Sequence, residues 1–205
     1  TGHVLFVCDE ADGLSHALPW STLIFARQKL RLFADLTDLD PKDRIAPMFD
    51  ALAGRGRYGD LWVEHPDSDE AKPLAGLARS FGNALRPALR QRGLLTDKDD
   101  PRLPRLHVCF LAGDHALLGA SDVRDSSPWH LGVPRLRQLS EAPSRSALKL
   151  EEALLTLLTA EERTRLIKPG MCVADLGAAP GGWSWILARH HFRVLAVANG
   201  PMAES

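Results

Sequence analysis

The stretch from Cys172 to Ser205 constrains the fold more than any other part of the chain. It reads CVADLGAAPGGWSWILARHHFRVLAVANGPMAES, an order typical of a buried strand, a glycine-rich turn, a helix and a second strand. A helix that connects two strands in this way brings the second strand back parallel to the first. In such a sheet a ligand binds outside the carboxyl ends of the strands, which is where this turn lies. The stretch therefore predicts an α/β fold with a ligand site at the turn.

The glycine-rich turn, from Asp175 to Trp183, fits neither of the common phosphate-binding patterns. A dinucleotide fingerprint needs a second glycine where Ala179 stands, and a P-loop needs a lysine where Trp183 stands. The turn still suits a ligand, because its glycines let the backbone approach closely and the helix N-terminus offers N–H donors to a carboxylate. Asp175 is placed either to organise the loop or to reach a cationic or hydroxyl group. These properties suit the amino-acid tail of S-adenosylmethionine, and they equally suit a turn that needs glycines only for its shape.

Composition limits the compartment and the partners. A net charge of -1 over 205 residues gives no global attraction to nucleic acid, so a polyanion must be met by a local basic patch. No apolar run approaches the roughly 18–20 residues that span a bilayer, and the first residues lack the basic region of a signal peptide. The three cysteines, Cys8, Cys109 and Cys172, lie far apart in apolar runs and fit no metal or disulfide spacing. We therefore expect buried, reduced thiols in a cytoplasmic protein without a metal.

The sequence before the glycine-rich turn predicts an α+β or α/β unit over residues 1–125 and then a connecting segment. Strands are expected at 3–8, 59–65 and 105–113, helices at 20–36, 42–56 and 69–93, and an exposed loop at 94–104. The segment 125–146 contains three prolines and no sustained periodicity, which is typical of an ordered linker or of a long functional loop. After it begins an amphipathic helix with Ser146 as its expected N-cap; its apolar stripe is Leu150, Ala153, Leu154, Leu157 and Leu158.

Five stretches resemble a known family. DLGAAPGGWS resembles the motif I loop of the FtsJ/RrmJ-type 2'-O-ribose RNA methyltransferases, and PSRSALKLEEA, which precedes it, resembles their SRaxxKLxE helix. Three further stretches are similar to the RlmM-type enzymes, which methylate a cytidine ribose in 23S ribosomal RNA: STLIFARQ (21–28), SSPWHLGVPRLR (126–137) and NGPMA (199–203). On these motifs the chain is identified as a member of the RlmM-type 23S rRNA 2'-O-ribose methyltransferases.

The resemblance implies an α/β chain in four parts. These are the end of an N-terminal ferredoxin-like region at 1–13, a THUMP-type RNA-binding domain at 14–130, a linker at 131–143, and the first part of a Rossmann-like methyltransferase domain at 144–205. It also implies S-adenosyl-L-methionine as the cofactor and 23S ribosomal RNA as the partner. A cytoplasmic monomer that contacts no membrane is expected.

Motif matching places the candidate site residues. The positions where the family contacts S-adenosylmethionine correspond to Ser146, Ala179, Pro180, Gly181 and Gly182. The candidate cofactor set also includes Asp175, Gly177 and Trp183 from the turn and Ala198 from the end of the second strand. Lys149 falls on the first lysine of the family's Lys-Asp-Lys-Glu catalytic set. A ribose hydroxyl is a poor nucleophile near neutral pH, so a positioned base helps its methylation. A lysine acts as that base only where burial or a nearby positive charge lowers its pKa. Without the family match, Lys149 reads as a solvated surface lysine.

Basic residues near the linker are the candidates for RNA binding. Arg135, Arg137 and Arg145, with Lys149, outnumber the one acid in residues 131–150, and Trp129 and His130 precede them. Such a patch suits phosphate contact and base stacking, and the alternative is a solvated charged loop. A second cluster, Arg86, Arg90 and Arg92, is more typical of a charged helix face. The pair His190-His191 is interpreted as a helix C-terminus favoured by the dipole, not as a metal site.

Two departures from the family pattern leave alternatives open. The family reads VDNGPMA where this chain has Ala198, which cannot hydrogen-bond the cofactor ribose, so we expect weakened cofactor binding unless Asn199 compensates. The family's downstream aspartate, lysine and glutamate have no counterpart here, so we expect the chain to be part of a longer protein that carries the activity. The alternative function is a non-catalytic RNA-binding module with a vestigial methyltransferase domain. A transferase for small molecules is a weaker third possibility.

Overall fold

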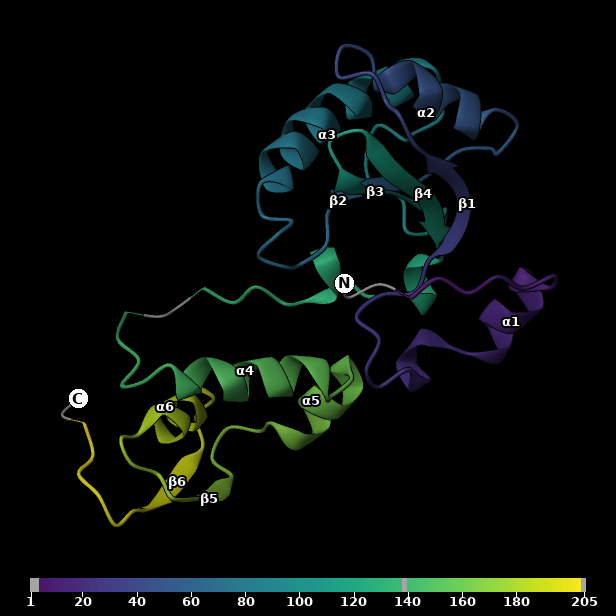
Figure 1. The fold of residues 1–205 in the computed structure, drawn as a ribbon. Helices are drawn as coiled ribbons and strands as arrows, with labels where there is room; N and C mark the ends of the chain where they lie inside the picture. Colours follow the sequence, from purple (N-terminus) through teal and green to yellow (C-terminus); the bar gives the residue numbers. More distant parts are fainter. Residues whose placement is uncertain (1–3, 138–139, 204–205) are drawn as a thin grey trace. The chain divides into compact units, whose positions relative to one another are not determined.

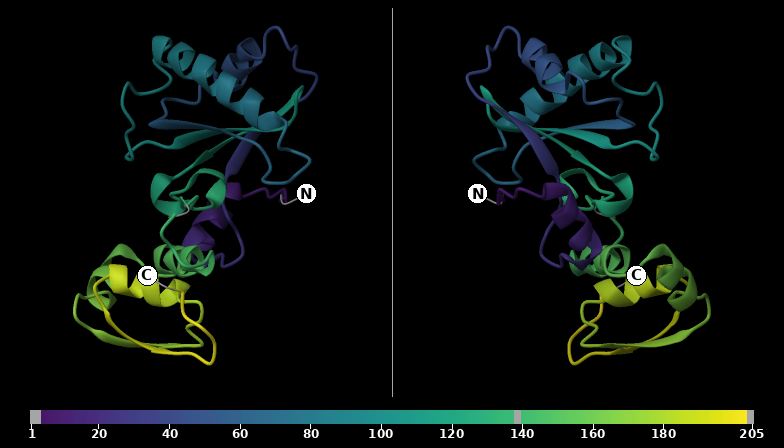
Figure 2. Two further views of the ribbon diagram at one scale, coloured as in Figure 1. Left: turned by 90° about the vertical axis from the view of Figure 1, so that its left-hand side faces the viewer. Right: turned by 90° about the vertical axis from the view of Figure 1, so that its right-hand side faces the viewer.

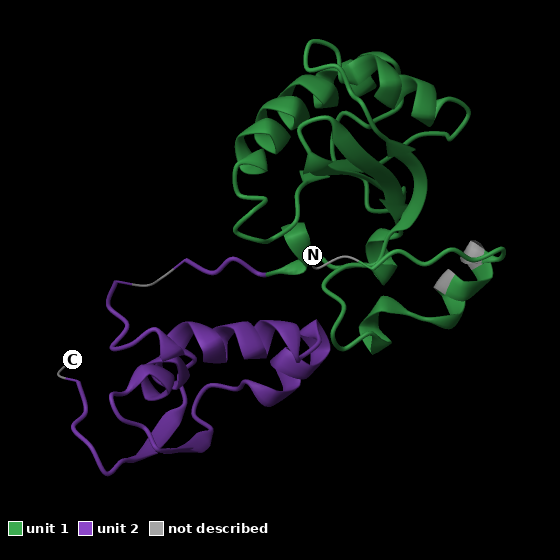
Figure 3. Ribbon diagram, viewed as in Figure 1, with its two compact units in different colours: residues 1–133 green, residues 134–205 purple. Residues whose placement is uncertain are grey.

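The computed structural model describes residues 4–137 and 140–203, which form two compact units (Figures 1 and 3). The N-terminal unit spans residues 1–133 and the C-terminal unit spans residues 134–205. Both units combine helices with a sheet, so the chain is of mixed α/β class, as the sequence predicts.

The N-terminal unit is built on a four-stranded sheet with the strand order β1-β4-β3-β2. The strands are β1 (Arg31–Leu36), β2 (Asp60–Glu64), β3 (Arg105–Ala112) and β4 (His115–Ser121). β4 pairs antiparallel with β1 and with β3, whereas β2 pairs parallel with β3. A parallel pair needs a long crossover, and helix α3 (Leu74–Gln91) supplies it between β2 and β3.

The apolar core lies between one face of this sheet and two helices, α2 (Ile45–Leu52) and α3, which cover the same face (Figure 2). α2 contributes Met48 and Leu52, and α3 contributes Leu85 and Leu89, all four fully buried. The strand side is formed by Leu106, Val108, Phe110 and Leu118. The unit also contains α1 (Ala11–Ala17) and the short helical turns η1 (Trp20–Thr22), η2 (Val123–Asp125) and η3 (His130–Gly132).

Several predictions for the N-terminal unit are confirmed and others are wrong. The strands expected at 59–65 and 105–113 are β2 and β3, and the helices expected within 42–56 and 69–93 are α2 and α3. The prediction of a helix at 20–36 is wrong, because residues 31–36 form β1 by pairing with β4. The strand expected at 3–8 is not formed over residues 4–8, and its first residue lies outside the described part of the chain. β4 was not predicted, and Leu95 in the loop expected to be exposed is buried.

The C-terminal unit contains the strand, turn, helix and strand that the sequence predicts. β5 (Cys172–Leu176) pairs parallel with β6 (Arg193–Val197), and α6 (Gly182–Arg189) connects them. α4 (Ser146–Thr156) packs against α6 and is followed by α5 (Ala160–Leu166), which was not predicted and which begins with a capping box between Thr159 and Glu162. Ser146 is the first helical residue of α4, not its N-cap: Arg145 occupies that position and makes no side-chain cap. Of the predicted apolar stripe, Leu157 is exposed, whereas Leu150, Ala153, Leu154 and Leu158 are half-buried.

The cysteine prediction holds for one residue of three. Cys109 is buried, and burial, with the nearby charge of Glu64, raises the pKa of its thiol to about 12. Cys8 and Cys172 are exposed, since residues 4–8 join no sheet and β5 has a neighbour on one side only. Within residues 4–137 and 140–203 no group of three potential metal ligands is present, and none of the helices there is long and apolar enough to cross a bilayer.

Candidate functional site

The glycine-rich turn lies at the carboxyl end of β5, beside the carboxyl end of β6. The backbone N–H groups of Gly177 and Ala178 both donate to the carbonyl oxygen of Val197, at 2.8 and 3.1 Å. Gly177 and Gly181 have φ angles of 84° and 110°, in the region that favours glycine. The turn is therefore tied to the last residue of β6 and needs glycine at two of its positions for its shape.

The carboxylate of Asp175 organises the turn. Asp175 is 6% exposed, and its Oδ2 accepts a hydrogen bond of 2.7 Å from the hydroxyl of Ser184 in the first turn of α6. This contact joins the end of β5 to the start of α6, on either side of the glycines. Of the two roles that the sequence allows for Asp175, the geometry supports the organising one. Ser184 was not predicted, although it lies two residues beyond the last glycine of the motif.

The first residues of α4 pack against the first residues of α6. The Oγ atoms of Ser144 and Ser146 are 2.5 Å apart, and a Cβ added to Gly182 would overlap both of them. The indole Nε1 of Trp183 donates to the carbonyl oxygen of Ser146 at 3.0 Å. Two motifs that are well separated in the sequence, around Ser146 and around Gly182, thus form one surface. A side chain at position 182 would have to displace these two hydroxyls.

We predict that Gly182→Ala weakens binding of S-adenosylhomocysteine by about tenfold. The added Cβ must displace both serine hydroxyls from the start of α6, and the loss of a hydrogen bond from such a hydroxyl to the ligand costs about 0.5–1.5 kcal/mol. Calorimetric titration with S-adenosylhomocysteine measures the change. Gly76→Ala is the control, because a Cβ there meets nothing within 4 Å, and it should leave the affinity unchanged. Equal affinity of Gly182→Ala and the unchanged protein would contradict the prediction.

The segment after β6 runs back along the glycine-rich turn. The N–H of Ala203 donates to the carbonyl oxygen of Pro180 at 2.9 Å, and the terminal methyl of Met202 lies 3.2 Å from the position of a Cβ on Gly181. Ala198 is exposed where this segment begins, directly after the residue whose carbonyl holds the turn. The structure therefore brings together the residues predicted to hold the cofactor: Ser146, Asp175, Gly177, Ala179, Pro180, Gly181, Gly182, Trp183 and Ala198. Met202 and Ser144 join them, and sequence reasoning assigned neither.

The candidate catalytic and RNA-binding side chains face solvent. Lys149 lies on the exposed face of α4 with Glu152 and Thr156, away from the contact with α6. Arg135, Arg137 and Arg145 are exposed. The opposite end of α6 is held by His190, whose Nε2 lies 3.1 Å from Glu151 Oε2 on α4. That pairing supports the structural interpretation of the histidine pair.

The second basic cluster, on α3, is engaged within the N-terminal unit. Arg86 Nη2 donates to the carbonyl oxygen of Leu61 at 2.5 Å, and Arg90 Nε donates to that of Thr96 at 3.0 Å. The guanidinium of Arg92 lies 3.5 Å from the centre of the Phe49 ring. These contacts favour the interpretation as a structural helix face and leave the basic stretch at 135–145 as the better candidate for RNA binding.

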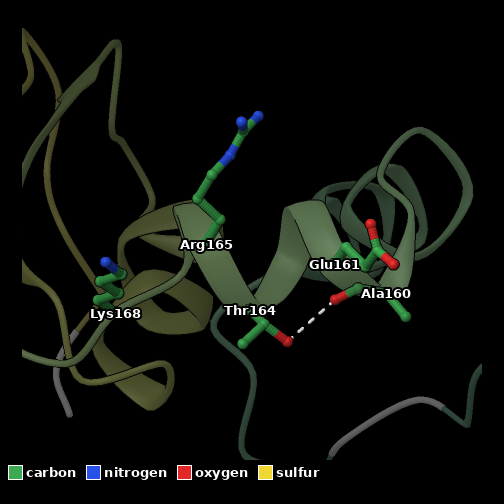
Figure 4. Close-up of a pocket in the computed structure, with 5 residues that line it drawn as sticks. All are labelled: Ala160, Glu161, Thr164, Arg165 and Lys168. Atoms are coloured by element: carbon green, nitrogen blue, oxygen red, sulfur yellow. Dashed lines mark hydrogen bonds between the residues drawn. The ribbon is translucent and has the colours of Figure 1, made fainter.

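A surface hollow of about 570 Å³ lies beside α5 (Figure 4). It is lined by Ala160, Glu161, Thr164, Arg165 and Lys168, and the hydroxyl of Thr164 donates to the carbonyl oxygen of Ala160 at 3.0 Å. None of the residues predicted for the cofactor or for RNA lines this hollow. We assign it no function, because its charged side chains do not converge on a common point (Figure 4).

Comparison with known proteins agrees with the two-unit organisation. Residues 43–122 match the family model "Ribosomal RNA large subunit methyltransferase M, N-terminal", and residues 142–204 match "FtsJ-like methyltransferase". The ribosomal RNA large subunit methyltransferase M of Xanthomonas campestris pv. campestris (strain B100) is 70% identical over 203 residues, covering 99% of this chain and 58% of that protein. The protein of the same name from Xanthomonas oryzae pv. oryzae (strain KACC10331 / KXO85) is 70% identical over 201 residues, covering 98% and 58%.

The chain thus spans about 58% of the length of these curated relatives. Among solved structures, the crystal structure of TrmN from Thermus thermophilus aligns with 95% of this chain and 53% of that chain, at 23% identity and a TM-score of 0.28. A score of that size does not establish a shared fold.

Proposed function

The chain belongs to the family of ribosomal RNA large subunit methyltransferase M, and from this premise we propose that the protein methylates the ribose 2'-hydroxyl of a cytidine in 23S ribosomal RNA. The observation that carries the proposal is the contact of Ser146 with Gly182 and Trp183. Two stretches that resemble separate motifs of the family meet there at the carboxyl end of a parallel strand pair. That is the place where sheets of this kind bind a ligand.

The proposed cofactor is S-adenosylmethionine, which supplies the methyl group when bound. The start of α6 offers backbone N–H donors for the carboxylate of its amino-acid tail, and Ser144 and Ser146 add hydroxyls beside it. Trp183 is 46% exposed and lies with its indole against Ser146, where it can cover the cofactor. Lys149, three residues beyond Ser146 on the exposed face of α4, is the proposed catalytic side chain of this part of the chain.

The domains are proposed as the resemblance implies. Residues 14–130 form a THUMP-type RNA-binding domain that follows the end of a ferredoxin-like region at 1–13, and residues 144–205 form the first part of a Rossmann-like domain. The linker at 131–143 carries Arg135 and Arg137, which with Arg145 are the proposed phosphate contacts. The protein is proposed to act as a monomer in the cytoplasm.

The test is methylation of 23S ribosomal RNA that lacks the modification, with a labelled methyl donor and mapping of the modified nucleotide. We expect one 2'-O-methylated cytidine. Lys149→Ala should slow its formation at least tenfold and leave the affinity for S-adenosylhomocysteine unchanged, because a side chain of the catalytic set contributes to the rate and not to cofactor binding. Lys168→Ala, another exposed lysine of the C-terminal unit, is the matched control. A methyl group on a base, or equal rates of the two variants, would contradict the proposal.

A non-catalytic RNA-binding protein is the second candidate, and Ala198 favours it. An alanine at this position offers the cofactor ribose no hydrogen-bond acceptor, which a vestigial site would tolerate. The same experiment separates the two. Binding of 23S ribosomal RNA without methyl transfer, together with undetectable binding of S-adenosylhomocysteine, would support the second candidate.

A further inference from the structure

Ser146 is held at both its backbone and its side chain. Its carbonyl oxygen accepts the hydrogen bond of 3.0 Å from Nε1 of Trp183, in the first turn of α6. Its Oγ lies 2.5 Å from the Oγ of Ser144. The hydroxyl of this first helical residue of α4 is therefore placed by two neighbours, one on α6 and one just before α4.

Ser144 is held in turn by the helix that follows it. Its carbonyl oxygen accepts a hydrogen bond of 3.2 Å from the N–H of Ala147, a residue that is 1% exposed. Ser144 and Ser146 are both partly buried. The two hydroxyls thus face each other from backbone that is bonded either to α4 itself or to α6.

Both hydroxyls lie against the first residue of α6. A Cβ on Gly182 would lie 2.3 Å from the Oγ of Ser144 and 2.5 Å from that of Ser146. Gly182 is buried, and it belongs to the first turn of α6, where the backbone N–H groups of a helix have no acceptor within the helix. The pair of hydroxyls therefore stands where the proposed function puts the carboxylate of the cofactor's amino-acid tail.

Counting protons gives the two hydroxyls different roles. Each serine hydroxyl carries one donor and two lone pairs, so the contact between them uses the proton of one and a lone pair of the other. One proton remains for a ligand. A carboxylate only accepts hydrogen bonds, so it binds the hydroxyl that still has its proton to donate. That hydroxyl is also the stronger donor, because hydrogen bonds in a chain polarise one another.

We propose that Ser144 is a positioning residue for cofactor binding: its hydroxyl donates to the Oγ of Ser146, and the hydroxyl of Ser146 donates to the carboxylate of the amino-acid tail. This inference rests on the proposed function, in which S-adenosylmethionine binds at the glycine-rich turn. Ser146 is the donor to the ligand because Trp183 ties it to α6, the helix that offers its N–H groups to the same carboxylate.

The size of the effect follows from the freedom that Ser144 removes. A serine side chain has three staggered χ1 positions, and the contact with Ser144 selects one of them for Ser146. Without that contact, binding of the ligand has to make the selection, which weakens binding by about threefold. Removal of the Ser146 hydroxyl costs more, about tenfold, because it deletes a hydrogen bond to a charged group.

The experiment is a double-mutant cycle with two ligands. The variants are Ser144→Ala, Ser146→Ala and the protein with both changes. Ser140→Ala is the matched control, since it removes an exposed hydroxyl four residues before Ser144. Calorimetry on the full-length protein measures the Kd for S-adenosylhomocysteine and for methylthioadenosine, which has the nucleoside and the sulfur but no amino-acid tail. The second ligand reports any general damage to the site.

The expected result is a loss that depends on the amino-acid tail. The Kd for S-adenosylhomocysteine should rise about threefold for Ser144→Ala and about tenfold for Ser146→Ala. The double variant should equal Ser146→Ala at about tenfold, and not reach the roughly thirtyfold of independent contributions, because Ser144 acts only through Ser146. Neither single change should alter the Kd for methylthioadenosine, and Ser140→Ala should alter neither Kd.

Three outcomes would overturn this inference alone: an unchanged Kd for S-adenosylhomocysteine in Ser144→Ala, a loss of about thirtyfold in the double variant, or equal losses for the two ligands in Ser144→Ala. The last of these would show that Ser144 supports the shape of the site and not the hydroxyl of Ser146. If methylthioadenosine binds too weakly to measure, the cycle with S-adenosylhomocysteine decides. If the unchanged protein binds no S-adenosylhomocysteine, the proposed cofactor fails and this inference falls with it.

Discussion

Replacing His107 with alanine is expected to destabilise the N-terminal unit by about 3–5 kcal/mol, because the buried carboxylate of Glu64 loses its nearest side-chain partner and keeps only His130, whose Nδ1 lies 3.5 Å away. His107 is 1% exposed and lies between Glu64 and Ser121, so its loss also leaves the Ser121 hydroxyl unpaired. A domain of this size is stable by only about 5–15 kcal/mol, so the variant would lose much of its stability.

The matched control is His115→Ala on the neighbouring strand. Its Nε2 lies 2.6 Å from Asp35 Oδ1, but the two side chains are 31% and 60% exposed, and such a surface pair contributes at most about 1 kcal/mol. Amide exchange of β3 in increasing urea measures the stability of the N-terminal unit separately from that of the C-terminal unit. If His107→Ala lost no more stability than His115→Ala, the buried network would not hold the sheet as described.

Local patterns account for the parts of the fold that the sequence predicts well. The turn within residues 172–197 can be predicted from local sequence alone. Gly177 and Gly181 adopt the positive φ angles that the turn needs, and the strands and the helix that it connects lie within a few residues of it. β1 differs, since its residues 31–36 become a strand only by pairing with residues 116–120 of β4, far along the chain. Apolar residues spaced along 20–36 also fit a helix, and nothing local to that stretch reveals the partner strand.

The hydrogen-bonded group of Glu64, His107 and Ser121 could not be predicted from the sequence for a related reason. Glu64, His107 and Ser121 stand on three strands, and only the sheet register brings them to one face. The same holds for Ser144 and Gly182, whose contact depends on how α4 packs against α6. Motif resemblance found Ser146 because the family pattern includes it, whereas Ser144 and Ser184 needed the structure. The role of each of these residues in binding remains a prediction.

Replacing Ala198 with aspartate is expected to tighten binding of S-adenosylhomocysteine by about 10- to 100-fold, the value of a charged hydrogen bond of roughly 1.5–3 kcal/mol. The carbonyl oxygen of the preceding residue, Val197, accepts hydrogen bonds from the N–H groups of Gly177 and Ala178. Position 198 therefore lies at the end of β6, beside the glycine-rich turn. An acidic side chain there suits the hydroxyls of the cofactor ribose.

Ala160→Asp separates this effect from a general effect of charge. It adds the same carboxylate at an exposed alanine of the C-terminal unit, at the start of α5 and outside the residues predicted to hold the cofactor. Calorimetric titration with S-adenosylhomocysteine should therefore show a large gain for Ala198→Asp and little change for Ala160→Asp. Equal affinities for the unchanged protein and Ala198→Asp would mean that the ribose does not reach the end of β6. The glycine-rich turn would then have to hold the cofactor in another orientation, or not hold it at all.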